Sequence, residues 1–111
     1  MGRPQKQKGN RVERKIVGML AERSVEAKRT WGSSGASMGL DDEVDIVISK
    51  VNEVKLDNDI YLQVKGRRKL ANYIKPKENV IQAQVLVQDR EQPLVVINFE
   101  DYVEYIKLKN A

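Results

Sequence analysis

Two short runs rich in β-branched and aliphatic residues, 44–51 and 59–65, dominate the apolar pattern in the middle of the chain. Polar residues interrupt both runs, Asp45 in the first and Gln63 and Lys65 in the second. Side chains two apart on a strand point to the same face, so Gln63 and Lys65 should share one. If the two runs pair as a hairpin, Asp45 joins them. A carboxylate, an amide and an ammonium would then converge on one point of a small sheet.

Apolar positions elsewhere predict the elements around this hairpin. Helical spacing of apolar residues from Val12 predicts a helix that begins at Asn10 and ends near Ser24. The further predicted elements are a strand at 26–31, a hairpin turn at 52–58, a helix at 76–90 with Pro76 in its first turn, a strand at 94–99 and a helix at 100–109. The strand–helix–strand section predicts parallel strands joined by a right-handed crossover.

Glu13 has two interpretations. With Asn10 as the N-cap, it falls at the third helical position, where a capping box prefers Glu. It also shares a helical face with Ile16 and Leu20, which would turn its carboxylate inward toward the sheet. Both can hold in part.

A loop of small residues, 32–40, separates the strand at 26–31 from the run that carries Asp45. Glycines let backbone amides approach a phosphate closely, and serine hydroxyls can donate hydrogen bonds to it. The loop lacks the Gly-Lys-Ser/Thr ending of a P-loop. A phosphate contact and an ordinary linker therefore both fit. Trp31, just before the loop, is expected in the core.

The 111 residues include no cysteine and no histidine. This excludes disulfides, Cys/His zinc sites, thiol nucleophiles and imidazole general bases. Catalysis would have to rely on carboxylates, Lys, Ser, Tyr or a hard metal ion bound by oxygen. No apolar run reaches the ~20 residues that span a bilayer, and the start lacks the apolar region of a signal peptide. We therefore expect a cytoplasmic protein.

The chain is mildly basic, with a formal net charge of +4. Its cations concentrate in residues 3–14 and 65–77, which suits a polyanionic partner such as nucleic acid. Residues 1–8 are polar, basic and interrupted by Pro4, so we expect a flexible basic arm there. Residues 9–111 should form a single domain.

If the hairpin cluster is catalytic, its nucleophile is water activated by a metal ion. Mg²⁺ prefers oxygen ligands and binds through one or two carboxylates together with phosphates. Asp45 supplies a carboxylate, Gln63 an amide oxygen and Val64 a peptide oxygen, and Glu13 could complete the shell. Lys65 would hold the attacking water or balance charge on the scissile phosphate.

Two other interpretations of the cluster stay open. Asp45, Gln63 and Lys65 could be ordinary residues on the wet face of an antiparallel sheet. A Ser–Lys hydrolase using Ser34 or Ser37 is a different enzyme class, but no oxyanion or pocket signal accompanies it.

The order of four stretches adds a resemblance to a known family. The stretches are Gly9–Arg14, Gly32–Gly35, Val44–Val47 and Gln63–Lys65. Together they resemble the PD-(D/E)XK nuclease superfamily, and more closely the archaeal-type Holliday junction resolvases, which also occur in phages. The resemblance covers nearly the whole chain.

This resemblance implies an α/β fold: a single-domain αβββαβ(α) restriction-endonuclease-like core, with a mixed sheet flanked by helices. It implies an endonuclease of DNA recombination and repair that hydrolyses phosphodiester bonds in four-way (Holliday) junctions. It further implies dependence on Mg²⁺, with Mn²⁺ as a substitute, and a homodimer in the cytoplasm, or the host cytoplasm for a viral member.

Carried onto this chain, the resemblance makes Asp45 the main metal ligand, Glu13 the helix-borne acid and Lys65 the motif lysine. The family's loop serine falls on Ser34 or Ser37, and both stay open. The implied DNA contacts are Arg11, Arg14, Ser33, Arg67, Arg68 and Lys69.

Gln63 departs from the family, which usually has Glu at this position. A neutral carbonyl lacks the Coulomb attraction of a carboxylate for a divalent ion. Three explanations remain: a natural variant that keeps activity, an engineered inactivation, and a protein that binds branched DNA without cleaving it. We expect the first, with the binding protein as the alternative function.

Overall fold

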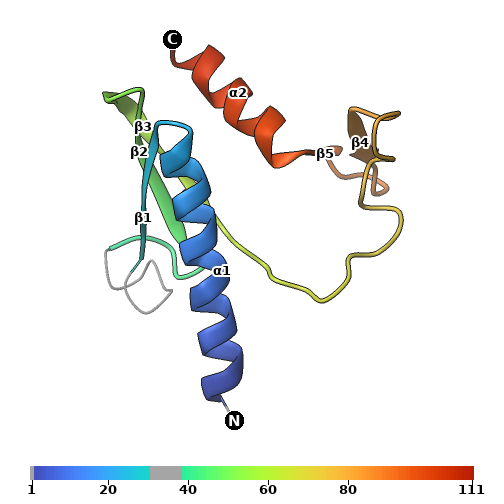
Figure 1. Ribbon diagram of the computed structural model, residues 1–111. Helices are drawn as coiled ribbons and strands as arrows, with labels where there is room; N and C mark the ends of the chain where they lie inside the picture. Colours follow the sequence, from blue (N-terminus) through green and yellow to red (C-terminus); the bar gives the residue numbers. More distant parts are fainter. Residues whose placement is uncertain (1, 31–38) are drawn as a thin grey trace.

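The computed structural model describes residues 2–30 and 39–111, with side chains described from Asn10 onward within these ranges. Its elements follow the chain from α1 to α2 (Figure 1). They are α1 (Gly2–Glu22), β1 (Val25–Arg29), β2 (Ile46–Val51), β3 (Val54–Leu62), β4 (Ala83–Leu86), β5 (Leu94–Ile97) and α2 (Phe99–Lys109).

The three predicted meander strands form an antiparallel sheet in the order β1-β2-β3. Its central strand β2 pairs Ile48 with Ala27 on one side and with Ile60 on the other. The β2–β3 turn is shorter than the predicted 52–58, because Asn52 and Glu53 both take positive φ, 51° and 67°. Such a two-residue turn matches the twist of the flanking strands. β3 consequently begins and ends earlier than predicted.

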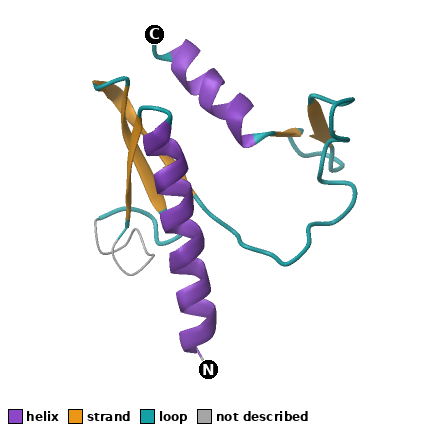
Figure 2. Cartoon of the chain, in the orientation of Figure 1, coloured by secondary structure: helices purple, strands orange, loops and turns teal. Residues whose placement is uncertain are grey.

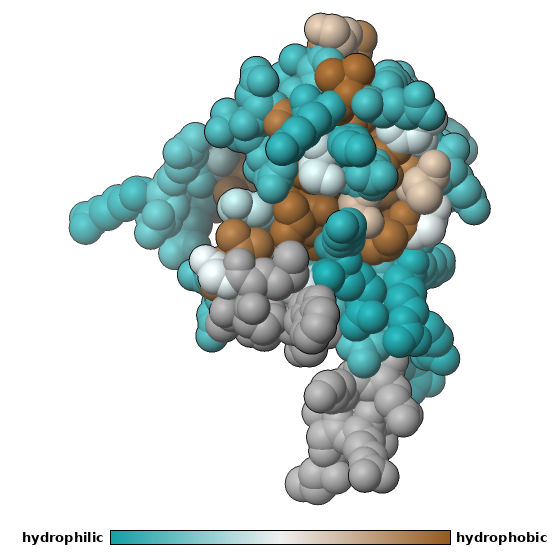
Figure 3. Space-filling model, turned by 90° about the vertical axis from the view of Figure 1, so that its left-hand side faces the viewer, coloured by the Kyte–Doolittle hydropathy of each residue, from teal (hydrophilic) through white to brown (hydrophobic). Residues whose placement is uncertain are grey.

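Both helices contribute to one core against this sheet (Figure 2). The core cluster consists of Leu20 from α1, Val25, Ile48, Val51 and Leu56 from the strands, and Val103 and Ile106 from α2. Full burial of an aliphatic side chain contributes about 1.5–3 kcal/mol, so these residues hold the helices in place. Figure 3 looks onto the side where the sheet lies in Figure 1 and shows apolar residues gathered between polar ones.

α1 begins at Gly2, before the predicted start at Asn10, so residues 2–8 are helical and not irregular. Pro4 lies in the first turn, where a missing N–H breaks no helical hydrogen bond. Asn10 is therefore not the N-cap, and Glu13 is not in a capping box. The division of the chain into an arm and one domain stays a prediction.

The predicted helix at 76–90 is wrong. Residues 63–82 contain neither helix nor strand, and β4 follows them. β4 pairs with β5 antiparallel in a separate two-stranded sheet, so the predicted parallel crossover is also wrong. The physical reason is that 83–86 pairs with 94–97 as a hairpin, which places Gln84 and Leu86 on the half-buried face.

The final helix is confirmed as α2, whose ends suit the helix dipole. Glu100 and Asp101 lie in its first turn, and Lys107 and Lys109 lie in its last. The described residues thus form a small α/β protein of two helices and antiparallel sheets, consistent with a restriction-endonuclease-like core.

Candidate functional site

Glu13 lies on the inward side of α1 and is only 4% exposed. Its Oε1 accepts a hydrogen bond from Arg29 Nε at 3.1 Å in an ion pair between α1 and the end of β1. Arg29 Nη2 also donates to Asn10 Oδ1 at 2.8 Å. A buried carboxylate is costly unless it is paired and hydrogen-bonded, and Arg29 provides both. Of the two interpretations of Glu13, the structure supports the inward one.

Asp45 lies immediately before β2 and is 9% exposed. Its Oδ2 accepts a hydrogen bond from the Val64 N–H at 2.7 Å, which fastens the chain after β3 to the start of β2. Its own N–H donates to the Leu62 carbonyl at 2.9 Å. A charge-assisted contact this short fixes the carboxylate in one orientation.

Thr30 supports Asp45 from the neighbouring strand end. Its N–H donates to the Asp45 carbonyl at 2.9 Å, and its Oγ1 donates to the Val44 carbonyl at 2.9 Å. Thr30 is 3% exposed, so these bonds are shielded from water. Together they hold the backbone on both sides of the Asp45 side chain.

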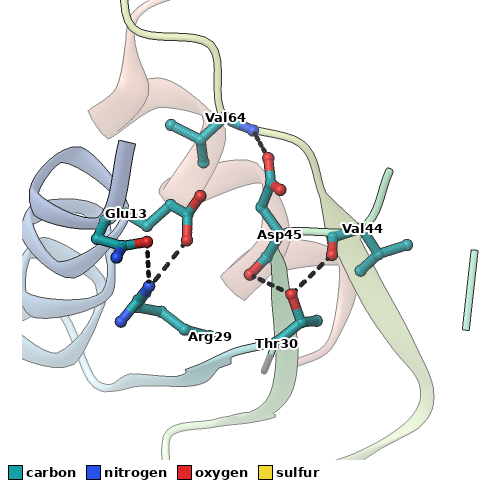
Figure 4. A network of polar contacts seen from close by, with 7 residues as sticks. Glu13, Arg29, Thr30, Val44, Asp45 and Val64 are labelled. Atoms are coloured by element: carbon teal, nitrogen blue, oxygen red, sulfur yellow. Dashed lines mark hydrogen bonds and ion pairs between the residues drawn. The ribbon is translucent and has the colours of Figure 1, made fainter. Parts of the chain in front are cut away.

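The two acidic side chains reach from α1 and from the start of β2 toward the space between helix and sheet (Figure 4). Carboxylate oxygens are the ligands that hard divalent cations prefer. Among the described residues, no group of three or more acidic, Cys or His side chains could hold a metal ion. The acidic side chains that Figure 4 shows at this site are Glu13 and Asp45.

Gln63 and Lys65 lie just beyond β3, which ends at Leu62, and the half-buried Val64 separates them. Both side chains are exposed. Gln63 lines an open hollow of about 240 Å³ together with Asp41 and Glu43. Asp41 itself caps a local turn, since its Oδ1 accepts the Glu43 N–H at 2.9 Å. Gln63 thus shares this hollow with two acidic residues that the sequence pattern did not connect with it.

The arginines and the lysine among the implied DNA contacts are exposed and form two groups along the chain. Arg11 and Arg14 are exposed on α1, while Arg67, Arg68 and Lys69 are exposed in the segment after β3. The loop serines Ser33, Ser34 and Ser37, like Trp31, lie outside the described residues.

Arg29 and Thr30 are the site residues that the sequence analysis missed. Strand alternation places Arg29 on the same face as small Ala27, and a buried acid on the opposing helix requires a cation. This signal could have identified Arg29. Thr30 carried no comparable signal, because its role depends on how β1 and β2 end.

The fold and the paired carboxylates define a class: small α/β proteins with a restriction-endonuclease-like core and an acidic site between a helix and the sheet. The family model of the archaeal Holliday junction resolvases matches residues 4–108 of the chain. The chain belongs to this family.

Comparison with curated proteins found no match, and comparison with solved structures found none. In the part of the chain that the structure describes, no helix has the length and apolar character required to cross a membrane.

Proposed function

We propose that this protein is a metal-dependent, structure-selective endonuclease that hydrolyses phosphodiester bonds in four-way DNA junctions. The observation that carries the proposal is the pair of buried carboxylates, Glu13 and Asp45, held by separate elements within a chain of the resolvase family. Burial of two acids is costly for a small protein, and a catalytic requirement gives a reason to retain them.

The ligands available fit a hard divalent ion in chemical type. Asp45 and Glu13 offer carboxylate oxygens, and Gln63 and Val64 offer carbonyl oxygens. Mg²⁺ commonly binds through one or two carboxylates together with substrate phosphates, so a pair of acids is sufficient. When bound, the ion would polarise a phosphate oxygen and make a water molecule a better nucleophile at neutral pH. Mn²⁺ should replace it.

The other residues of the site would position the acids and the DNA. The Val64 N–H holds Asp45 in one orientation, and Arg29 holds Glu13. Lys65, exposed just beyond β3, would balance charge on the scissile phosphate or orient the attacking water. Ser34 or Ser37 would serve as the loop serine.

The exposed cations would bind the DNA backbone. Arg11 and Arg14 on α1 and Arg67, Arg68 and Lys69 after β3 would contact phosphates, with Ser33 as a further contact. Phosphate contacts position a protein on DNA without reading its sequence, which suits selection by DNA shape.

We also propose that the protein acts as a homodimer, since a four-way junction offers two equivalent strands. The apolar residues Val103 and Ile106 of α2 are buried in the chain's own core, so they are not available to a second copy. Sedimentation at micromolar concentration should show a dimer, and a monomer of 12.7 kDa would contradict it.

A second candidate function is binding of branched DNA without cleavage. Gln63 in place of the family's usual Glu favours it, together with the acidic pair in place of a larger acidic group among the described residues. Both functions predict affinity that falls steeply with salt, so only cleavage separates them.

The deciding experiment incubates synthetic four-way junctions with the protein and Mg²⁺ or Mn²⁺. We expect nicks near the branch point, loss of cleavage in Asp45→Ala, and retained cleavage in the control Asp41→Ala, an exposed loop acid. Tight binding without cleavage in either metal would reject the enzyme. The Gln63→Glu variant then shows why cleavage is absent. If this variant cleaves the junction, Gln63 is the defect; if it does not, the protein only binds branched DNA.

A further inference from the structure

The segment that joins β3 to β4 is the most basic surface of the described chain. Residues 65–77, here called the basic segment, carry six cations and no acid: Lys65, Arg67, Arg68, Lys69, Lys75 and Lys77. All six side chains are exposed. Figure 1 shows the segment leaving the three-stranded sheet without helix or strand and running to β4. Its charge and exposure fit a phosphate backbone.

Tyr73 lies within the basic segment and is 67% exposed, an unusual state for a large aromatic side chain. Its position is nevertheless fixed, because Gln84 Nε2 on β4 donates a hydrogen bond to the Tyr73 carbonyl at 3.1 Å. This bond anchors the Tyr73 backbone and leaves the ring exposed among cations, the combination that binds unpaired nucleic acid.

A cavity of about 470 Å³ adjoins Tyr73 at the end of the β4–β5 sheet. Leu86, Val87 and Leu94 supply its apolar wall. Gln88, Glu91 and Gln92 supply polar groups, and no cation lines it. An apolar wall with a few amide and carboxylate groups suits the flat face and polar edge of a nucleobase. A phosphate would be repelled by Glu91.

We infer that Tyr73 and this cavity receive one unpaired nucleobase from the branch point of the DNA, while the basic segment binds the phosphates that flank it. The inference rests on the proposed function, because the branch point of a junction interrupts base stacking and is where a base is most easily unpaired. Charge favours this occupant over a second copy of the chain. Two identical basic segments would repel one another, whereas single-stranded DNA complements them.

The first test measures binding of catalytically silent protein, without metal, to junctions that carry two unpaired thymines at the branch point. Tyr73→Ala should weaken this binding by about 5- to 150-fold, the size of base–aromatic stacking. Tyr73→Phe should stay within about twofold, since it keeps the stacking face. Tyr105→Ala is the control, because Tyr105 is 53% exposed and lies on α2, outside the basic segment. Binding to an unbranched duplex should not depend on residue 73.

The second test locates the base directly. A 5-iododeoxyuridine at the branch point should photo-cross-link to Tyr73, and one placed in the middle of an arm should not. Equal junction affinity of wild type and Tyr73→Ala overturns the inference and leaves the proposed function standing. A Tyr73→Ala protein that changes its oligomeric state without DNA also overturns it, because the surface would then contact a second copy. Wild type that prefers junctions no more than duplexes overturns the proposed function, and the inference with it.

Discussion

Removal of Arg29 should destabilise the protein, because it takes away the cation that pairs with the buried Glu13 carboxylate. The Glu13 side chain is 5% exposed and the Arg29 side chain is 22% exposed, and their ion pair measures 3.1 Å. Loss of one partner of a fully buried pair costs about 3–5 kcal/mol. The partial exposure of Arg29 lets water reach the site and lowers this figure, so we expect about 2–3 kcal/mol for Arg29→Ala.

The assay is urea unfolding of Arg29→Ala, Glu13→Gln and the double variant, without divalent ions. Glu13→Gln should relieve much of the loss in the Arg29→Ala background, because a neutral amide does not require a cation. The coupling free energy of the cycle should therefore be about 1–3 kcal/mol.

The control for this cycle is Lys50→Ala. Lys50 forms an exposed pair with Glu26 at 3.9 Å, with side chains 47% and 54% exposed. Such a surface pair contributes less than about 1 kcal/mol. If Arg29→Ala loses no more stability than Lys50→Ala, the argument that a buried charge pair joins α1 to β1 is refuted.

Two further predictions concern Thr30, which is buried, and Tyr102, which is half-buried. Thr30→Val should lower the free energy of unfolding by about 1–3 kcal/mol in urea titrations, because it leaves the buried Val44 carbonyl without its 2.9 Å donor. Burial raises the pKa of Tyr102 above 10.0, and the neighbouring Tyr105 adds to the shift. The neutral phenol is thus favoured in the fold, and the stability linked to it is complete below pH 10 and lost as pH rises through the folded pKa. Melting temperatures of Tyr102→Phe should lack this alkaline component, and unchanged alkaline behaviour would contradict it.

The meander and the last helix could be predicted because their signals are local. Ile46 and Ile48 alternate with residues of the opposite face, and α2 combines apolar spacing with charges that suit its dipole. β4 could not be predicted in this way. A short apolar run is ambiguous between helix and strand, and pairing with β5 across residues 87–93 decides that β4 is a strand.

The sequence predicted which acids belong to the candidate site, but not the contacts that position them. Asp45 and Glu13 attract notice because each interrupts an apolar face. The contact of Asp45 with the Val64 N–H depends on where β3 ends. The end of β3 depends on the tight β2–β3 turn and on a register irregularity between Ile48 and Lys50. No local sequence pattern predicts this irregularity.

The role of Gln63 depends on which acidic residues it acts beside. Two groups are candidates. Asp45 and Glu13 bring two negative charges to the helix–sheet site, and Arg29 cancels one of them. Gln63, however, lines the hollow that contains Asp41. A carboxylate at position 63 should tighten Mg²⁺ binding by about tenfold or more, since it adds a full charge to either set.

Combining Gln63→Glu with a second substitution shows whether a carboxylate at position 63 binds the metal ion together with Asp45 or with Asp41. Titration calorimetry of Gln63→Glu, alone and with Asp45→Asn or with Asp41→Asn, measures the gain in each background. The proposed function requires the gain to vanish with Asp45→Asn and to survive Asp41→Asn, because only then does position 63 act beside the buried carboxylate pair. A gain that depends on Asp41 instead would place a substituted residue 63 in a surface site, and Gln63 would then have no part in cleavage.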